Sequence, residues 1–307
     1  MAKVRLIVNP AAGGGTSEQF IPDIKRKLDD LGVDFDLVRT ERPWHAAELA
    51  QDAAAEVDVV VAVGGDGTAN EVLNGLILAK DAGHSAAMGI LCVGRGNDLA
   101  FGMGIPTDWS IGCQSLAADL RRTVDVGRVT GGDFPDGRYF GNGIGVGFDA
   151  VVGFVAARQK HLRGFIGYFV AAIKTIFLYF KAPLVHLEYD ELPMDLHALM
   201  VSVMNGTRMG GGFMMAPEAK PDDGQFDLCI ARQVSRPRIF TLMLKFLKGA
   251  QFAHPAITDG RTQRITITAL EGSLPAHADG ETLCTEGSKL EIEIIPHALQ
   301  IVTDTEA

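Results

Sequence analysis

The first 127 residues alternate short apolar runs with longer segments of helical periodicity, which predicts strands and helices in turn. The expected strands are residues 3–10, 33–40, 57–65 and 86–94. The expected helices are residues 17–32, residues 44–56, a segment that starts near Thr68 and a short one near Asp98. Strands that alternate with helices in this order build a parallel sheet with helices on both faces. The pattern therefore predicts a doubly wound α/β domain, and ligands of such a domain bind at the carboxyl ends of its strands.

The pattern changes after about residue 127, where short strand-like runs are separated by turn residues. These runs lie within residues 124–150, 184–190, 197–206, 226–234, 264–270 and 289–296. Two helical segments, near residues 164–181 and 237–250, interrupt them. We therefore expect a second, mainly antiparallel domain over residues 128–307, and a cleft between the two domains.

Composition fits this picture and narrows the classes of protein. Apolar residues make up 47% of the 307 residues, as in a globular protein with a hydrophobic core. The net charge of −10 argues against a nucleic-acid-binding protein, which normally carries a basic face. The four cysteines are far apart and form no CxxC pair, which favours an intracellular, reducing compartment. No signal peptide is expected, because the apolar run at the N-terminus is too short.

Candidate chemistry is concentrated in glycine-rich turns that follow predicted strands. Residues 8–15, VNPAAGGG, can present backbone N–H groups to an anion, although they also suit a tight strand-to-helix connection. Residues 64–68, GGDGT, precede a helix whose N-terminus favours phosphate. Asp66 in this turn would repel phosphate unless a cation lay between them, so it indicates Mg²⁺; the alternative is a turn or N-cap residue. Residues 93–100, VGRGNDLA, form a third such turn, where a polar side chain could simply cap the next helix.

Acidic residues supply two further candidates in the second half. Residues 277–281, HADGE, hold Asp279 and Glu281 two positions apart, which in a strand puts both on one face and lets a carboxylate act as general base. A solvated turn is the alternative. Residues 216–228 form an oxygen-rich loop in which Asp223 and nearby carbonyls could bind a hard cation. The DDG sequence of this loop also predicts a β-turn, and the two interpretations are compatible.

Taken together, these stretches resemble the diacylglycerol kinase catalytic family, in its soluble bacterial lipid-kinase branch, which is related to sphingosine and ceramide kinases. The matching sequences, in family order, are VNPAAGGG, TERPWHAAELA, AVGGDGTANEVLNGL, LCVGRGNDLA, TVDVGRV, NGIGVGFDA, MNGTRMGGGFMMAPEAKPDDGQFDLCIA and AHADGE. The resemblance implies an α/β nucleotide-binding domain over residues 1–127 and a β-sandwich-like lipid-substrate domain with inserted helices over residues 128–307. In this fold the extreme C-terminus can pack back on the first domain. The resemblance also implies ATP and Mg²⁺ as cofactors and a lipid hydroxyl as phosphoryl acceptor.

Nucleotide contacts follow from the resemblance by position. The residues that match them are Asn9, Thr40, Gly64, Gly65, Asp66, Gly67, Thr68, Ala69, Asn70, Arg95, Gly96, Asn97 and Asp98. The chain departs from the family at Arg95, where many members have threonine. The hydroxyl that matches a nucleotide contact in those members is therefore absent here, and arginine could instead contact phosphate directly.

The resemblance assigns the catalytic and metal roles in the same way. Asp66 and Asp125 match the acidic network around the catalytic Mg²⁺. Glu281, with Asp279 beside it, matches the general base. The residues that match a structural Mg²⁺ site are Lys220 and Gln225, through carbonyls, and Asp223, through its side chain.

Two basic segments bear on the lipid. Residues 158–181 and 231–254 each carry five Lys or Arg and no acidic residue, which suits an anionic membrane surface. They could instead be core helices with solvated basic ends. The apolar stretch 164–180 is interrupted by Lys174 and is short for a membrane span. We expect a cytoplasmic enzyme that associates peripherally with membranes, with a homodimer as an open possibility and no nucleic-acid partner.

The expected acceptor is diacylglycerol or a related glycerolipid, and a sphingoid base or another lipid or soluble alcohol stays open. An NAD-kinase-like enzyme shares the GGDGT turn, but NEVLNG and HADGE favour the lipid branch. A non-catalytic lipid-binding regulator is disfavoured by the retained Asp66, Asp125 and Glu281. A Rossmann dehydrogenase is disfavoured because GNGIGVG lies in the strand-rich half.

Overall fold

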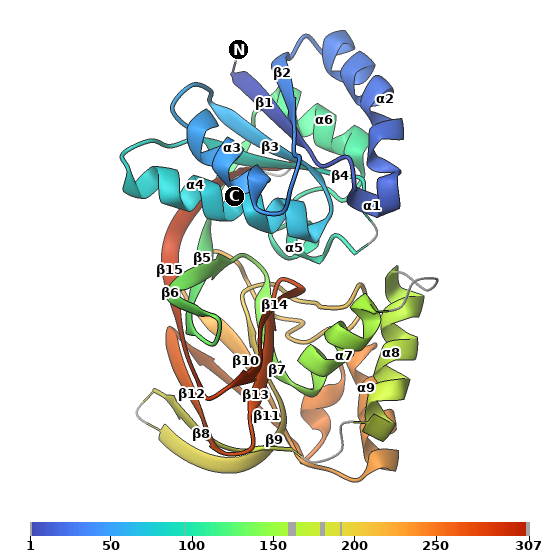
Figure 1. The fold of residues 1–307 in the computed structure, drawn as a ribbon, viewed down its shortest axis with the longest axis vertical. Coiled ribbons are helices and arrows are strands. Elements are labelled where there is room, and N and C mark those ends of the chain that lie inside the picture. The colour runs from blue at the N-terminus through green and yellow to red at the C-terminus, as the bar shows by residue number, and fades with distance from the viewer. Residues whose placement is uncertain (1, 95, 159–163, 179–181, 191, 305–307) are drawn as a thin grey trace. The chain divides into compact units, whose positions relative to one another are not determined.

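The computed structural model describes residues 2–94, 96–158, 164–178, 182–190 and 192–304 (Figure 1). The chain divides into two compact units. One comprises Met1–Val126 together with His297–Ala307, and the other comprises Gly127–Pro296. The division after Val126 lies one residue before the boundary expected from the sequence, and the C-terminal residues belong to the first unit.

The first unit contains a parallel sheet with the strand order β2-β1-β3-β4, beside which lies the end of β15. Its strands are β1 (Lys3–Val8), β2 (Asp34–Arg39), β3 (Val59–Gly64), β4 (Ala87–Cys92) and β15 (Lys289–Val302). Every residue of β3 and β4 is buried, as expected for central strands with helices on both faces. The doubly wound α/β architecture predicted for this half is confirmed.

Helices cover the two faces of this sheet (Figure 1). They are α2 (Ser17–Asp30), α3 (His45–Ala53), α4 (Asp66–Asp81), α5 (Asp98–Gly102) and α6 (Trp109–Ala118), and the four-residue α1 (Ala12–Gly15), whose Gly13 and Gly14 are not helical, is a turn before α2. α2 and α6 share one core with the strands, where Ile24 of α2 packs in the same cluster as Leu6 and Val61. α3 and α4 pack closely together, because a Cβ atom on Gly75 would lie 2.1 Å from the carbonyl oxygen of Ala47. The helix α6 has no counterpart among the expected helices.

The second unit is built from two sheets that share one long strand. Its strands are β5 (Arg121–Gly131), which begins in the first unit, β6 (Phe134–Phe140), β7 (Gly143–Gly147), β8 (Leu184–Tyr189), β9 (Leu192–Met204), β10 (Phe226–Arg232), β11 (Ile257–Thr262), β12 (Arg264–Glu271), β13 (Leu274–Ala278), β14 (Glu281–Gly287) and the first part of β15. One sheet has the order β14-β13-β7-β9-β10-β11. The other has the order β9-β8-β12-β15-β5-β6. The first half of β9 pairs with β8 and the second half with β7 and β10, so β9 joins the two sheets.

The two sheets enclose one apolar core, and helices enclose another. Phe140 of β6 stacks on Phe226 of β10 in the first core, with ring centroids 5.6 Å apart. The helices α7 (Phe148–Ala157), α8 (Gly164–Leu178) and α9 (Arg236–Phe246) pack in the second core, against the outer face of the β7-β9-β10 sheet. This arrangement confirms the β-sandwich-like domain with inserted helices. The four cysteines are free and buried. Among the described residues, no helix has the length and apolar character needed to cross a membrane.

Candidate functional site

In the first unit, the predicted nucleotide residues gather where the parallel strands end. Asn9 directly follows β1, and Thr40 directly follows β2 and donates its backbone N–H to the carbonyl oxygen of Val8. The Asn9 side-chain amide donates to Oγ1 of Thr68 at 3.0 Å and accepts from the N–H of Ala11 at 3.0 Å. The loop after β1 is therefore tied to the first turn of α4.

The turns after β3 and β4 contact each other directly. The N–H groups of Val93 and Gly94 both donate to the carbonyl oxygen of Gly64 at 3.1 Å. A Cβ atom on Gly94 would lie 2.7 Å from the Cα atom of Gly65, so the two backbones approach as closely as glycine permits. Asp66 spans the two turns, because its Oδ1 accepts from the N–H of Leu99 at 2.9 Å. The structure thus brings Gly64–Thr68 together with Gly96–Asp98, whereas Arg95 lies outside the described residues.

Several features of these turns suit a ligand. Gly13, Gly14 and Gly15 have φ values of +64°, +80° and +91°, as expected for a loop that exposes backbone N–H groups. Gly65 begins α4 at its N-cap, with an extended backbone that any residue could adopt. Asn97 has a φ of +54°, and its buried Oδ1 atom has no hydrogen-bond partner and caps no helix.

Three predicted residues of the first unit are buried. Ala69 and Asn70 lie buried in the first turns of α4, and the Asn70 side chain accepts from Asn74 at 3.3 Å. Asp125 lies on β5 with none of its surface exposed, and its Oδ1 accepts from the N–H of His297 at 2.7 Å. Asp125 therefore helps to hold the C-terminal segment on the first unit.

In the second unit, Asp279 and Glu281 lie at a tight hairpin between β13 and β14. Asp279 and Gly280 have φ values of +48° and +85°, and Ala278 pairs with Glu281. Positive φ at both central residues defines a two-residue hairpin turn, for which Asp-Gly is a favoured sequence. The expectation that the two acids share one face of a strand is therefore wrong: Asp279 is a buried turn residue, and Glu281 is exposed at the start of β14.

The carboxylate of Asp279 accepts three backbone hydrogen bonds. Its donors are the N–H groups of Gly141 at 2.8 Å, Asn142 at 2.9 Å and Gly143 at 3.0 Å. These contacts join the hairpin to the loop before β7. The geometry gives Asp279 a positioning role, and leaves Glu281 as the exposed carboxylate beside it.

The predicted cation loop contains a carboxylate oxygen that lacks a partner. Asp223 Oδ1 accepts from the N–H of Gln225 at 3.1 Å, as in the expected turn, and Arg261 donates to its other oxygen. The Oδ2 atom of Asp227 is buried without a hydrogen-bond partner, and burial raises the pKa of this carboxyl. Two neighbouring carboxylates, one with an unpartnered oxygen, fit a hard cation. In the described part of the chain, no group of three or more His, Cys, Asp or Glu side chains is arranged so that it could hold a metal ion.

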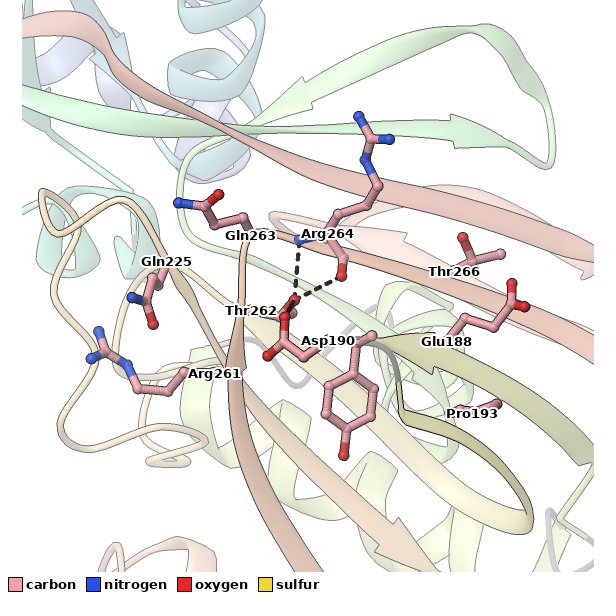
Figure 2. A pocket seen from close by; sticks show the side chains of 10 residues that line it. Glu188, Asp190, Pro193, Gln225, Arg261, Thr262, Gln263, Arg264 and Thr266 are labelled. Carbon is pink, nitrogen blue, oxygen red and sulfur yellow. Dashed lines mark hydrogen bonds between the residues drawn. The ribbon is translucent and has the colours of Figure 1, made fainter.

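Gln225 and Arg261 also line a polar groove of about 710 Å³ at the edge of the second unit (Figure 2). On its other side, Thr262 donates to Asp190 at 2.9 Å and accepts from the N–H of Arg264 at 3.2 Å. Both charge signs occur around the groove, so it does not by itself select an anion or a cation.

A group of residues under the helices of the second unit was not expected from the sequence. Asp149, in the first turn of α7, is buried, and burial raises the pKa of its carboxyl to about 7. It borders a cavity of about 60 Å³ that is otherwise lined mainly by apolar side chains. The signal available in the sequence was the acidic residue that closes GIGVGFD, an apolar and glycine-rich run.

Comparison with known families assigns both halves of the chain. Residues 3–129 match the model of the diacylglycerol kinase catalytic domain. Residues 142–303 match the YegS C-terminal NAD kinase beta sandwich-like domain. The two matched ranges correspond closely to the two structural units.

Individual relatives agree with these matches over nearly the whole chain. The diacylglycerol kinase of Mycobacterium tuberculosis is 27% identical over 98% of this chain and 95% of its own length. The diacylglycerol kinase of Staphylococcus saprophyticus is 26% identical, over 91% and 88% respectively. A diacylglycerol kinase structure from Bacillus anthracis, 22% identical, superposes with a TM-score of 0.74 and covers 98% of this chain and 97% of its own. Yeast NADH kinase shares the fold at a TM-score of 0.50 and 13% identity, over 99% of this chain and 84% of its own.

Proposed function

We propose, from the premise that the chain belongs to the diacylglycerol kinase family, that it transfers the γ-phosphate of ATP to the hydroxyl of diacylglycerol or a closely related glycerolipid. Membership of this family makes the chain a phosphotransferase that uses ATP and acts on a lipid alcohol. The observation that carries the proposal is the pair of glycine turns after β3 and β4, joined by Asp66 at the N-terminus of α4.

In this proposal the first unit binds the phosphates of ATP mainly through its backbone. The N–H groups of the glycine turns and the positive end of the α4 dipole stabilise negative charge on the phosphoryl oxygens. The carboxylate of Asp66 stands at this N-terminus, where it fits a role in holding a cation. Mg²⁺, when bound, supplies positive charge that offsets the charge of the phosphates.

Glu281 then serves as the general base. The oxygen of the lipid hydroxyl forms a bond to the γ-phosphorus, the bond from that phosphorus to the β-phosphate oxygen breaks, and ADP leaves. The hydroxyl proton passes to Glu281, whose exposed carboxylate is open to a substrate. Asp279 fixes the hairpin that carries this base through its three backbone hydrogen bonds.

A second cation, with a structural role, is proposed at the loop of Asp223. The unpartnered oxygen of Asp227 supports it, together with the carbonyls of Lys220 and Gln225 named from the family. Arg261 already neutralises Asp223 in part, so we expect this site to bind Mg²⁺ weakly.

We propose further that α8 and α9 rest on an anionic membrane surface. Ile166 and Phe177 on α8 are 65% and 67% exposed, and Phe240 on α9 is 43% exposed. Neither helix carries an acidic residue, and both helices carry exposed basic residues, such as Lys174 on α8 and Arg238 on α9. Apolar side chains with surrounding basic charge are typical of helices that lie in the membrane interface.

Vesicle flotation tests the membrane proposal. The chain should float with phosphatidylcholine vesicles that contain phosphatidylglycerol and should float poorly with phosphatidylcholine alone. Phe177→Ser should reduce flotation, whereas Leu270→Ser, at an apolar residue of β12 that is 50% exposed, should not. Flotation that ignores anionic lipid, or falls equally in both variants, would reject the proposal.

Transfer of radiolabelled phosphate tests the kinase proposal. The chain is incubated with ATP and Mg²⁺ and with diacylglycerol, monoacylglycerol, sphingosine or NAD as acceptor, the lipids in mixed micelles. Label should enter diacylglycerol, and Asp66→Asn should reduce transfer while Asp81→Asn, at the exposed end of α4, leaves it unchanged. Label in NAD and in no lipid would overturn the assignment of the acceptor.

A further inference from the structure

A row of small and polar residues crosses one sheet of the second unit beneath α7. His277 of β13 pairs with Gly145 of β7, which pairs with Ser202 of β9. Directly paired residues in a sheet point to the same face. Ile144 and Ala276, next to the row, lie in the core between the two sheets. The row therefore faces the helices, on the side of the sheet where the other buried residues are mainly apolar.

Asp149 and His277 converge above Gly145. A Cβ atom on Gly145 would lie 2.1 Å from Oδ2 of Asp149 and 2.5 Å from Nε2 of His277, so a side chain at this position would displace both groups. Ser202 donates to the same Asp149 oxygen at 3.4 Å, and the N–H of Ala150 donates to the other at 2.9 Å. Two ionisable side chains from separate segments are thus held together over a glycine.

The imidazole of His277 contains a buried donor that has no acceptor. Burial lowers the pKa of His277 to about 4, so the ring is neutral near pH 7. Its Nδ1 accepts from the N–H of Gly280 at 3.3 Å, which leaves the proton on Nε2. The Nε2 atom is buried and has no hydrogen-bond partner. Buried donors are nearly always satisfied, so an unsatisfied one next to Asp149, which borders the cavity, indicates a ligand group.

The cavity beside Asp149 is apolar and can adapt. It is lined by residues of α7, α8, α9 and β9, among them Val152, Ala172, Leu199 and Leu242. Four of its lining residues are methionines: Met200, Met209, Met215 and Met243. Methionine side chains rearrange easily, so the volume of about 60 Å³ can grow around a hydrocarbon chain. No lysine or arginine is among the lining residues that the structure describes.

We infer that Asp149 and His277 together bind an uncharged polar group of the lipid acceptor, an ester oxygen, at the polar end of this cavity. The inference rests on the proposed lipid-kinase function and narrows its substrate class to neutral glycerolipids. An ester oxygen accepts from Nε2 of His277, and the carboxyl of Asp149, whose pKa burial raises to about 7, can donate to an ester oxygen in its protonated form. An ammonium group has no lone pair for His277, and a phosphate would meet Asp149 without a cationic side chain to offset the repulsion. Asp149 and His277 are therefore positioning residues for the lipid, separate from Glu281.

Kinetics on matched variants test this assignment. Asp149→Asn and His277→Gln should each lower kcat/KM for diacylglycerol by about ten- to a hundredfold, mainly through KM for the lipid, with KM for ATP unchanged. Ser202→Ala removes only a hydroxyl that contacts Asp149, and should give a smaller change in the same direction. The control is Thr175→Val, which removes a buried hydroxyl of α8 bonded to the carbonyl of Ala171 and should leave the lipid KM unchanged.

A binding assay separates this inference from the proposed function. The probe is a radiolabelled diacylglycerol analogue whose free hydroxyl is replaced by hydrogen, so that it binds without reacting. Asp149→Asn and His277→Gln should weaken its binding, and sphingosine or lysophosphatidic acid should compete poorly. If the unchanged chain phosphorylates no lipid, the kinase proposal fails. The binding assay still shows whether Asp149 and His277 contribute to lipid binding. Unaltered binding in both variants, or stronger binding of sphingosine than of diacylglycerol, would overturn the inference.

Discussion

The two units provide their polar groups in different ways. In the first unit the glycine turns offer backbone N–H groups, and side chains such as Asn9 and Asp66 hold those turns together. In the second unit the polar groups are side chains whose surroundings differ sharply: Glu281 is exposed, whereas Asp149 and Asp279 are buried. A mutation cannot remove a backbone N–H group without changing the path of the chain, but it can replace a side chain and leave the backbone in place. The comparison therefore predicts that side-chain substitutions in the second unit have the larger effects on turnover.

The largest effect is expected from Glu281→Gln. Glutamine keeps the shape of the side chain but cannot accept a proton, so kcat should fall by about 10²- to 10⁴-fold while ATP binding stays nearly intact. Steady-state transfer of labelled phosphate, with ATP binding measured separately, checks this. The matched control is Glu286→Gln, at a second exposed glutamate on β14, which should retain full activity. Normal turnover in Glu281→Gln would remove this residue from the mechanism.

The next effect concerns the stability of the second unit. Two buried side chains, Asp149 and His277, change this stability in opposite directions as pH rises. The pKa of Asp149 rises from 3.8 to about 7 on folding, so the folded state binds a proton that the unfolded state releases. Asp149 therefore lowers stability as pH rises from about 4 to about 7, by about 4 kcal/mol. The pKa of His277 falls from 6.5 to about 4, so His277 raises stability between about pH 4 and pH 6.5, by about 3 kcal/mol.

Single variants should separate the two contributions to the change of stability with pH. Asp149→Asn leaves the His277 contribution, so its stability should increase with pH over this window, and His277→Gln should show the opposite slope. Cys229, on the strand next to Ser202, stays neutral because burial raises the pKa of its thiol to about 12. Urea unfolding at a series of pH values measures the slopes, with Thr175→Val as the control that should follow the unchanged chain. Parallel curves for all four proteins would show that the two groups titrate normally.

The contrast between glycine turns in the first unit and separate side chains in the second also explains what could be predicted from the sequence. The glycine turns were recognisable because each lies within a few consecutive residues directly after an apolar strand. The group of Gly145, Asp149, Ser202 and His277 comes from three separate segments, and only the pairing of β13, β7 and β9 brings them together. No local pattern encodes that pairing, so this part of the site had to come from the structure.

The sequence led to a wrong prediction where two local patterns, a strand period and a turn sequence, occurred in the same residues. The spacing of Asp279 and Glu281 was interpreted with the period of a strand, but the Asp-Gly pair between Ala278 and Glu281 favours a two-residue hairpin turn, and the turn prevails. The helix α7 was not expected, because its sequence FDAVVGFVAA has no polar face and carries no helical periodicity. A helix buried between a sheet and other helices does not need one.

A smaller loss of stability is expected from Asp279→Ala. The substitution leaves three backbone N–H groups without their acceptor and places alanine at a φ of +48°. The free energy of unfolding should fall by about 2–4 kcal/mol. Asp279→Asn should lose less, because asparagine retains one acceptor oxygen and tolerates positive φ. Urea unfolding distinguishes them, with Asp136→Asn on β6 as an exposed control. Equal stability of the alanine variant would show that these hydrogen bonds do not hold the hairpin.

The smallest effect, and the one that probes the backbone-lined turns directly, is expected from Gly65→Ala. The φ of Gly65 is −112°, and a Cβ atom there would meet only the Cα of Gly94, at an ordinary 3.6 Å, so the protein itself tolerates alanine. We therefore predict that glycine is needed at this position for the close approach of a phosphate. KM for ATP should rise by about ten- to a hundredfold with unchanged stability, the equivalent of losing one charge-assisted hydrogen bond. The control is Gly153→Ala, where a methyl group meets nothing within 4 Å. It should neither raise KM for ATP nor lower stability. An unchanged KM for ATP in Gly65→Ala would mean that this turn does not approach the nucleotide, and that phosphate binding depends on side chains in the first unit as well.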